Sequence, residues 1–279
     1  MEKIIFSSQY FNILDTLDCG QTFRFKPYSQ GFIVLSKDRC AYLYSQDNQT
    51  IIECLEQDEE YFHNYFDLSR DYAKICESAI KENIPILTSA VKKGKGIRIL
   101  NQDKEEMLFS FIISQNNNIP RIKGIISKLC LVLGDKIEFL GQEYYSFPTA
   151  VKMAEKDVSF YESIGLGYRA KYIKSLADAI KKGLNVNDFN NLPTKELKAK
   201  LTSIFGVGPK VADCVALFSF HRSDSFPVDT WIEKVYVEDL KGTIKDRAKI
   251  ADYLVERFKE NSGYYQQYLF YYKRLIQKQ

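Results

Sequence analysis

The stretch Leu201-Thr-Ser-Ile-Phe-Gly-Val-Gly-Pro-Lys-Val-Ala-Asp-Cys214, followed by Phe226-Pro-Val-Asp229, organises the second half of this 279-residue chain. Apolar residues at helical spacing predict a helix that runs up to Phe205. Gly206-Val207-Gly208 then predicts a tight turn, because glycine enters positive φ without a Cβ clash. Pro209 suits the first position of a second helix, where its missing N–H would be unpaired anyway. The stretch therefore predicts two helices joined by a glycine hairpin, over about residues 195–220.

The hairpin and the lysine that follows it suggest two functions, phosphate binding and nucleophilic catalysis. N–H groups of Gly206, Val207 and Gly208 at the positive end of a helix can hold a DNA phosphate. Lys210 lies in the first turn of the second helix, where the partial positive charge disfavours a cation. This placement favours the neutral amine, which is a nucleophile. A solvated lysine that contacts a phosphate is the alternative, and the local sequence leaves both interpretations open.

Composition narrows the class of protein. With 45% hydrophobic residues the chain can bury large cores and form two or three domains. A net charge of +3 and a pI of 8.3 fall short of the strongly basic footprint of many DNA-binding proteins. Six cysteines without a Cys-x-x-Cys pair argue against a zinc or iron–sulfur site and for reduced thiols inside a cell. We see neither a signal peptide nor an apolar run of membrane-spanning length.

The chain predicts an α+β protein. Residues 1–95 are expected to form an antiparallel β domain with helices, because short connections between strands cannot carry parallel crossovers. The predicted strands are Gln21–Phe25, Gly31–Leu35, Ala41–Tyr44 and Thr50–Cys54. Residues 59–82 are more helical. The basic segment Lys92–Arg98 is our candidate domain boundary, expected to be a solvated linker, and from residue 96 to 279 we expect helices to the end.

These motifs together resemble a known family. Gly206–Cys214 and Val228-Asp229 resemble the helix-hairpin-helix and Gly/Pro…Asp signature of a DNA glycosylase superfamily, and the closer match is to the eukaryotic-type 8-oxoguanine DNA glycosylases. The resemblance implies two helical subdomains after the β domain. It also implies a bifunctional enzyme, in which Lys210 attacks C1′ of a flipped nucleotide, forms a Schiff base and cleaves the strand 3′ to the abasic site by β-elimination.

Asp229 is expected to have two roles. It precedes a predicted helix over Thr230–Val237, so it suits the N-cap. In the family this aspartate lies near the sugar, stabilises oxocarbenium charge and assists deprotonation of the lysine. The family usually has a histidine two positions further that contacts a phosphate, and this chain has Trp231 there. The substitution puts that contact, but not the chemistry, in doubt.

Further matches imply a pocket for the flipped base. Cys19-Gly20-Gln21-Thr-Phe-Arg24 matches the family's Gly-Gln-x-Phe-Arg motif, in which the carbonyl at Gly20 accepts a hydrogen bond from N7–H of 8-oxoguanine. Guanine has no proton at N7, so this carbonyl distinguishes the two bases. By the same resemblance Gln266 bonds the Watson–Crick edge, while Phe270 and Cys214 close the two faces. From the residues alone, a glycine turn and core aromatics would be the ordinary interpretation.

Two segments match the family's contacts to the opposite strand. Ser114-Gln-Asn-Asn-Asn-Ile-Pro-Arg121 implies that Asn116 enters the gap left by the flipped nucleotide and that Arg121 binds the orphaned cytosine. Gly165-Leu-Gly-Tyr-Arg169 implies that Tyr168 wedges into the stack and that Arg169 contacts the same cytosine. Asparagines in a turn and a solvated basic helix are the ordinary alternatives.

The resemblance also sets expectations for partners and leaves two alternatives. We expect duplex DNA that contains 8-oxoguanine as the substrate, no metal or organic cofactor for the chemistry, a monomer, no membrane, and a prokaryotic cytoplasm; a monovalent cation at the hairpin is left open. His63 and His221 match no catalytic position and are expected to be structural or exposed. A related glycosylase would keep Lys210 and Asp229 with another substrate. A binding module without catalysis would leave that pair unexplained.

Overall fold

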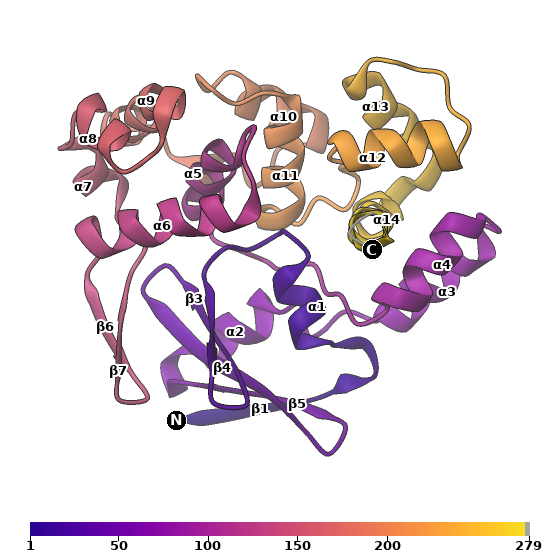
Figure 1. Ribbon diagram of the computed structural model, residues 1–279, viewed down its shortest axis with the longest axis horizontal. Helices are drawn as coiled ribbons and strands as arrows, with labels where there is room; N and C mark the ends of the chain where they lie inside the picture. Colours follow the sequence, from indigo (N-terminus) through magenta and orange to yellow (C-terminus); the bar gives the residue numbers. More distant parts are fainter. Residues whose placement is uncertain (277–279) are drawn as a thin grey trace.

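Five strands from the first 54 residues form one antiparallel sheet in the computed structural model, which describes residues 1–276 (Figure 1). Its order is β1-β5-β4-β3-β2, so the predicted meander is confirmed, and the N-terminal strand adds beyond it at the β5 edge. The strands are β1 (Glu2–Ser7), β2 (Phe25–Tyr28), β3 (Gly31–Ser36), β4 (Arg39–Gln46) and β5 (Gln49–Cys54). The prediction of a strand over Gln21–Phe25 was wrong, since β2 begins only at Phe25. Gln21 is buried and bonds the backbone of Arg98 and Leu100 instead of a neighbouring strand.

The sheet is buried on both faces. Val34 and Leu43 pack with Phe62 of helix α2 (Glu59–Tyr65) on one face. Ile33 packs on the other face with Phe139, which belongs to a hairpin of strands β6 (Lys136–Phe139) and β7 (Gln142–Tyr145). Figure 1 shows this hairpin extending from the helical region down beside the sheet. The expectation of helices to the end of the chain was therefore wrong here, because the sheet's second apolar face requires a cover.

The helices divide into two groups along the chain. Those of the first region are α1 (Ile13–Asp18), α2, α3 (Tyr72–Lys81) and α4 (Pro85–Gly94). Those of the second region are α5 (Lys104–Ser114), α6 (Ile119–Leu133), α7 (Ala150–Ala154), α8 (Val158–Ser163), α9 (Ala170–Lys181), α10 (Thr194–Thr202), α11 (Pro209–Ser219), α12 (Thr230–Lys234), α13 (Arg247–Phe258) and α14 (Ser262–Ile276). The fold class is as predicted, and the boundary near residue 95 stays a prediction.

The segment predicted to be a solvated linker is not one. Lys92 and Lys93 form the last turn of α4 and are exposed, but Arg98 is only 1% exposed. Its guanidinium donates to the carbonyls of Phe66, Asp67 and Tyr10, because a buried cation requires partners for its N–H groups. The connection between the regions is thus fixed rather than free.

Packing of the second region brings distant segments to one place. Helix α5 packs against α11, and α14 packs against α4, α12 and α13. Figure 1 shows α14 almost end-on between α12 and α4, with the loop after α1 close to it. One continuous core includes Cys19 and Phe23 from the first region together with residues of α5, α11 and α14. The loop that carries Gly20 therefore meets the helices that carry Cys214 and Phe270.

Candidate active site at the helix-hairpin-helix motif

Helices α10 and α11 form the predicted helix-hairpin-helix motif. Helix α10 ends at Thr202, earlier than predicted, and exposed Phe205 leaves the helix to pack edge-on against Tyr172, with ring centroids 4.9 Å apart. Gly206 has φ +90°, and a Cβ there would overlap the ring of Tyr172, so both the turn and the packing require glycine. Gly208 then precedes Pro209, the first residue of α11. The hairpin places its backbone at the rim of a cleft.

Lys210 and Asp229 lie where that cleft meets a second, smaller cavity. The cleft has a volume of about 780 Å³ and is lined by the asparagine loop, the hairpin, Asp229 and Trp231. The cavity has a volume of about 50 Å³ and is lined by the loop at Gly20 and by residues of α5, α11 and α14. Among the described residues, Lys210 and Asp229 are the two that line both. Lys210 is half-buried, and its Nζ lies 5.3 Å from the ring centre of Phe111.

Asp229 caps α12, as predicted. Its Oδ1 accepts hydrogen bonds from the backbone N–H groups of Trp231, at 2.9 Å, and Ile232, at 3.0 Å. The cap fixes the carboxylate at the mouth of the cavity while the residue stays half-buried. The predicted helix over Thr230–Val237 begins as α12 and continues as a π-helical turn, Val235–Asp239. The catalytic role of Asp229 stays a prediction.

The small cavity brings together the four predicted base-pocket residues. Gly20 has φ +88°, and a Cβ there would lie 3.3 Å from Cε1 of Phe270. Gln266 is 4% exposed, and its Nε2 donates to the carbonyl of Pro227 at 3.1 Å, while its Oε1 has no hydrogen-bond partner among the described residues. An unpartnered buried acceptor at a cavity wall suits a ligand that offers N–H donors. Gln267 bonds the Cys19 carbonyl at 2.9 Å and thereby holds the Gly20 loop against α14.

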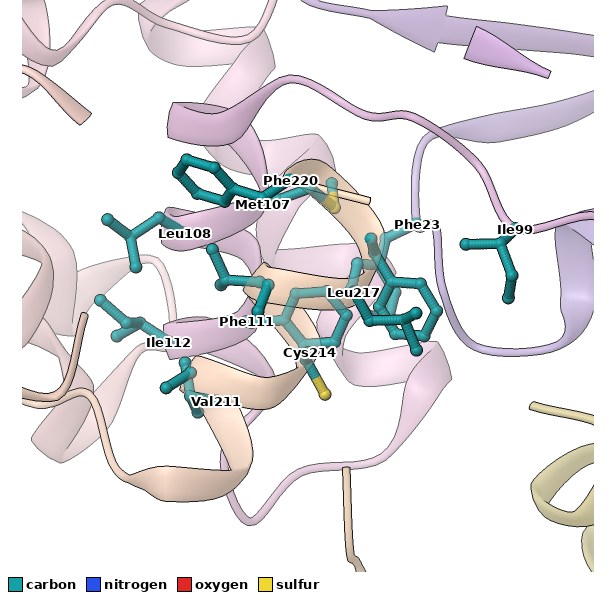
Figure 2. Packing of buried hydrophobic residues seen from close by; sticks show 14 of the residues in the cluster. Phe23, Ile99, Met107, Leu108, Phe111, Ile112, Val211, Cys214, Leu217 and Phe220 are labelled. Carbon is teal, nitrogen blue, oxygen red and sulfur yellow. The ribbon is translucent and has the colours of Figure 1, made fainter. Parts of the chain in front are cut away.

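Cys214 also lines the cavity. Figure 2 shows it on α11 at the edge of the cluster that α5 and α11 form, with its sulfur directed away from Met107 and Leu108. Burial raises the pKa of its thiol to about 11, and the nearby Lys210 charge opposes that rise only in part. The thiol is therefore neutral at physiological pH, a small apolar surface rather than a nucleophile.

Of the four residues predicted to contact the opposite strand, Asn116 and Tyr168 line the cleft, whereas Arg121 and Arg169 do not. Asn116 has a left-handed backbone, with φ +46°, and lines the cleft beside the half-exposed Tyr168. Arg121 is exposed and donates to the carbonyl of Gly165 at 3.3 Å. Arg169, in contrast, is 3% exposed, and its guanidinium donates to the carbonyls of Gln115 and Asn116. In this conformation Arg169 supports the asparagine loop, so contact with cytosine would require it to leave those carbonyls.

Sequence reasoning missed residues whose partners are distant in the chain. Asp213 of α11 is buried and forms a 2.7 Å ion pair with Lys198 of α10. The sequence did contain one signal for this ion pair, since Asp213 is a charged residue on an otherwise apolar helix. Gln115 also lines the cleft, as does Trp231, which had already stood out in the sequence. His221 is structural, as expected, and bonds Asn101 and Tyr264, while His63 is exposed.

Residues 1–276 contain neither a cluster of metal-binding side chains nor a helix suited to cross a membrane. No group of three or more His, Cys, Asp or Glu side chains in this part of the chain is placed to hold a metal ion. None of its helices is both long enough and apolar enough to cross a membrane.

Comparison with known proteins identifies the class. Residues 109–260 match the family model of the HhH-GPD superfamily base excision DNA repair proteins, and residues 3–108 match that of the 8-oxoguanine DNA glycosylase N-terminal domain. A Clostridium acetobutylicum 8-oxoguanine glycosylase/lyase, solved with double-stranded DNA containing cytosine opposite 8-oxoguanine, is 38% identical with a TM-score of 0.91, over 96% of this chain and 93% of that one. The chain thus belongs to the helix-hairpin-helix DNA glycosylases, and within them to the 8-oxoguanine glycosylase/lyase family.

Curated relatives agree with this assignment. The N-glycosylase/DNA lyase OGG1 of Arabidopsis thaliana is 35% identical over 191 residues, which are 63% of this chain and 52% of that protein. The N-glycosylase/DNA lyase of Saccharomyces cerevisiae is 37% identical over 158 residues, 52% of this chain and 42% of that protein. The chain therefore spans about half the length of these two relatives. A 3-methyladenine DNA glycosylase of Archaeoglobus fulgidus shares the fold, with a TM-score of 0.78 at 19% identity.

Proposed function

We propose that this chain excises 8-oxoguanine opposite cytosine from duplex DNA and then cleaves the strand at the abasic site. The observation that carries the proposal is that Lys210 and Asp229 line both the wide cleft and the small cavity. In a flipped nucleotide, C1′ joins the base to the sugar and backbone. A nucleophile and a carboxylate where the wide cleft meets the small cavity would therefore lie beside the bond to be broken.

The cavity walls support 8-oxoguanine as the base. The Gly20 carbonyl would accept from N7–H, which guanine lacks, and the free Oε1 of Gln266 would accept from the Watson–Crick edge. Phe270 and Cys214 both line the cavity, and they would sandwich the ring between them. A volume of about 50 Å³ holds only a few water molecules, so we expect the partly exposed Phe270 to move outward when a base enters.

The chemistry needs only groups that the chain supplies. The neutral amine of Lys210 attacks C1′, the electron pair of the glycosidic bond leaves with the base, and the base takes up a proton. Asp229 stabilises the positive charge that develops on the sugar and accepts a proton from the attacking amine. Ring opening gives a Schiff base between Lys210 and C1′. Loss of a proton from C2′ then expels the 3′ phosphate, and water releases the lysine.

Residues at the cleft would hold the bent duplex. The hairpin, Gly206 to Gly208, would bind a phosphate of the damaged strand through backbone N–H groups. Tyr168 would wedge into the stack, and Asn116 and Arg121 would bind the orphaned cytosine. Unstacking costs a few kcal/mol per step, and these insertions would offset it.

A panel of duplexes tests the substrate assignment. Single-turnover base release should be measured on otherwise identical duplexes that contain 8-oxoguanine, guanine, 3-methyladenine or uracil opposite cytosine, and 8-oxoguanine opposite each of the four bases. We expect release of 8-oxoguanine, fastest opposite cytosine, and none of guanine. Release of another base in preference would indicate a related glycosylase, and tight binding without any release would indicate a binding module.

We include in the same proposal that the protein is a monomer and that it acts in a prokaryotic cytoplasm. The relatives come from a plant and a yeast as well as a Clostridium, so the matches favour no single kind of cell. Light scattering of the protein alone and with one equivalent of damaged duplex should give the mass of one chain and of a 1:1 complex. A mass of two chains would contradict the expectation.

A further inference from the structure

Gln115 connects the hairpin to the asparagine loop. Its side-chain Nε2 donates to the carbonyl of Gly206 at 2.8 Å, across 91 residues of sequence. Its own carbonyl accepts from the guanidinium of Arg169 and, at 3.4 Å, from the hydroxyl of Tyr168. One residue thus bonds the segment proposed to grip the damaged strand and the segment proposed to enter the opposite strand.

Aromatic contacts also connect the hairpin to the segment that carries Tyr168. The ring of Tyr172 packs edge-on against Phe205 on the hairpin, and Tyr168 packs edge-on against Tyr172 with centroids 5.9 Å apart. The Cα of Gly206 lies against the same Tyr172 ring. The hairpin is therefore held both by aromatic packing against Tyr172 and by the hydrogen bond from the Gln115 amide.

Resting on the proposed function, we infer that Gln115 is a positioning residue that couples phosphate binding at the hairpin to insertion of Asn116 and Tyr168 into the duplex. A loop preset relative to the hairpin loses less freedom when it inserts, so the flipped state is reached at lower cost. The backbone of Asn116 is left-handed, a conformation that is uncommon outside glycine. Contacts of the neighbouring Gln115 that hold this conformation would also preset the loop for insertion. If Gln115 couples the two segments, loss of its side chain should slow base flipping but should not weaken the initial binding of DNA.

Two substitutions of Gln115 test the coupling. Gln115→Leu keeps the approximate size and removes the donor, and Gln115→Glu places a carboxylate against the Gly206 carbonyl. The control is Gln46→Leu, the same exchange at an exposed site on β4 of the N-terminal sheet. For each protein we would measure the affinity for undamaged duplex and the single-turnover rate of 8-oxoguanine release. Base flipping would be followed by the fluorescence of 2-aminopurine, placed on the opposite strand across from the nucleotide next to the lesion.

We expect both Gln115 variants to bind undamaged duplex within about twofold of the parent and to flip and excise about three- to tenfold more slowly. Thermal unfolding, and rates normalised to the fraction of active protein, separate this effect from partial misfolding. The double variant Gln115→Leu/Tyr168→Leu should be no slower than Tyr168→Leu alone, because both act on one insertion step.

Either of two results with the single Gln115 variants would overturn the inference: parental flipping and excision in both variants, or losses of affinity for undamaged duplex as large as the losses in flipping and excision. Fully additive effects in the double variant would do the same. Failure of the proposed function can be distinguished from failure of this inference. If the parent protein gives the fluorescence change but releases no 8-oxoguanine, the proposed activity is wrong, but the coupling through Gln115 can still be measured by flipping.

Discussion

Asp229 combines a structural and an electrostatic task in one side chain. Its Oδ1 closes the first turn of α12, and its carboxylate lines the cavity beside Lys210. Asparagine is as good an N-cap as aspartate but carries no charge. The two tasks can therefore be separated by a single substitution.

Asp229→Asn should unfold within about 2 °C of the parent and release 8-oxoguanine about 100-fold or more slowly, the cost typical of losing one electrostatic contact to the transition state. Differential scanning fluorimetry and single-turnover base release provide the two measurements. Asp157→Asn, which alters the cap of α8 in the same way, is the control and should keep the parental rate. Parental activity in Asp229→Asn would assign the residue to structure alone.

Gly20 is the residue at which the cavity tolerates least change. Its φ of +88° is unfavourable for alanine, and the added Cβ would lie 3.3 Å from Cε1 of Phe270. Gly20→Ala should therefore cost about 1 kcal/mol in the free energy of unfolding and reduce 8-oxoguanine release more strongly than binding of an abasic-site duplex, in which no base enters the cavity. Equal losses for both ligands would show that the substitution disturbs the fold and not the base pocket.

At the scale of elements, the helix-hairpin-helix motif is held by the ion pair between Lys198 and Asp213. Burial raises the pKa of the Asp213 carboxyl, and the Lys198 charge opposes this without cancelling it. A raised folded-state pKa means that ionisation of Asp213 costs stability, and this cost grows as pH rises above the unfolded value near about pH 4.

Lys198→Met removes the opposing charge, so its loss of unfolding free energy relative to the parent should be small near pH 4 and reach about 3 kcal/mol by pH 7. Urea denaturation at several pH values measures this trend. The double variant Lys198→Met/Asp213→Asn should recover most of the loss. A deficit that does not change with pH would indicate lost packing of the lysine stem instead.

The elements also show what the sequence could and could not predict. Strands β3 and β5 and helix α11 follow from local composition and spacing and were predicted to within about one residue at each end, whereas the prediction for β4 was two residues short at each end. The β6–β7 hairpin turns at Leu140-Gly141, without an Asn-Gly or Asp-Gly signal, and its reason for forming is the distant sheet face that Phe139 covers. Arg98 looked like a linker residue because the carbonyls that bury it come from other segments.

At the scale of the whole molecule, the site exists because two regions are fixed to each other. Gly20 comes from the first region and Lys210 from the second, and α14 of the second region holds the first through Gln267, which bonds the Cys19 carbonyl, and through its packing on α4. Spacing could predict each motif separately, and the resemblance implied that they converge. Neither gave the contacts of Gln115, because its partners Gly206, Tyr168 and Arg169 lie in other segments of the chain.

Asp67 is part of this connection, since it bonds His221 after α11 and Arg70 before α3. Burial raises the pKa of Asp67, but the hydrogen bond from His221 and the charge of Arg70 outweigh it and hold the pKa below its usual value. A lowered folded-state pKa stabilises the fold above the unfolded value near about pH 4, and this contribution is lost as pH falls further.

Asp67→Asn should therefore lower the melting temperature at pH 7 by several degrees, and its difference from the parent should shrink towards pH 3. Calorimetry across this range measures both, with Asp47→Asn at an exposed turn as the control. A constant difference from pH 7 to pH 3 would show that the charge of Asp67 does not matter.

The most direct measurement is borohydride trapping on a duplex with one 8-oxoguanine opposite cytosine. The account predicts a covalent protein–DNA adduct with the parent and none with Lys210→Gln, because the Schiff base forms on the Lys210 amine at the junction of cleft and cavity. Base release by the parent without an adduct would contradict the account, since it would make the enzyme monofunctional and Lys210 something other than its nucleophile.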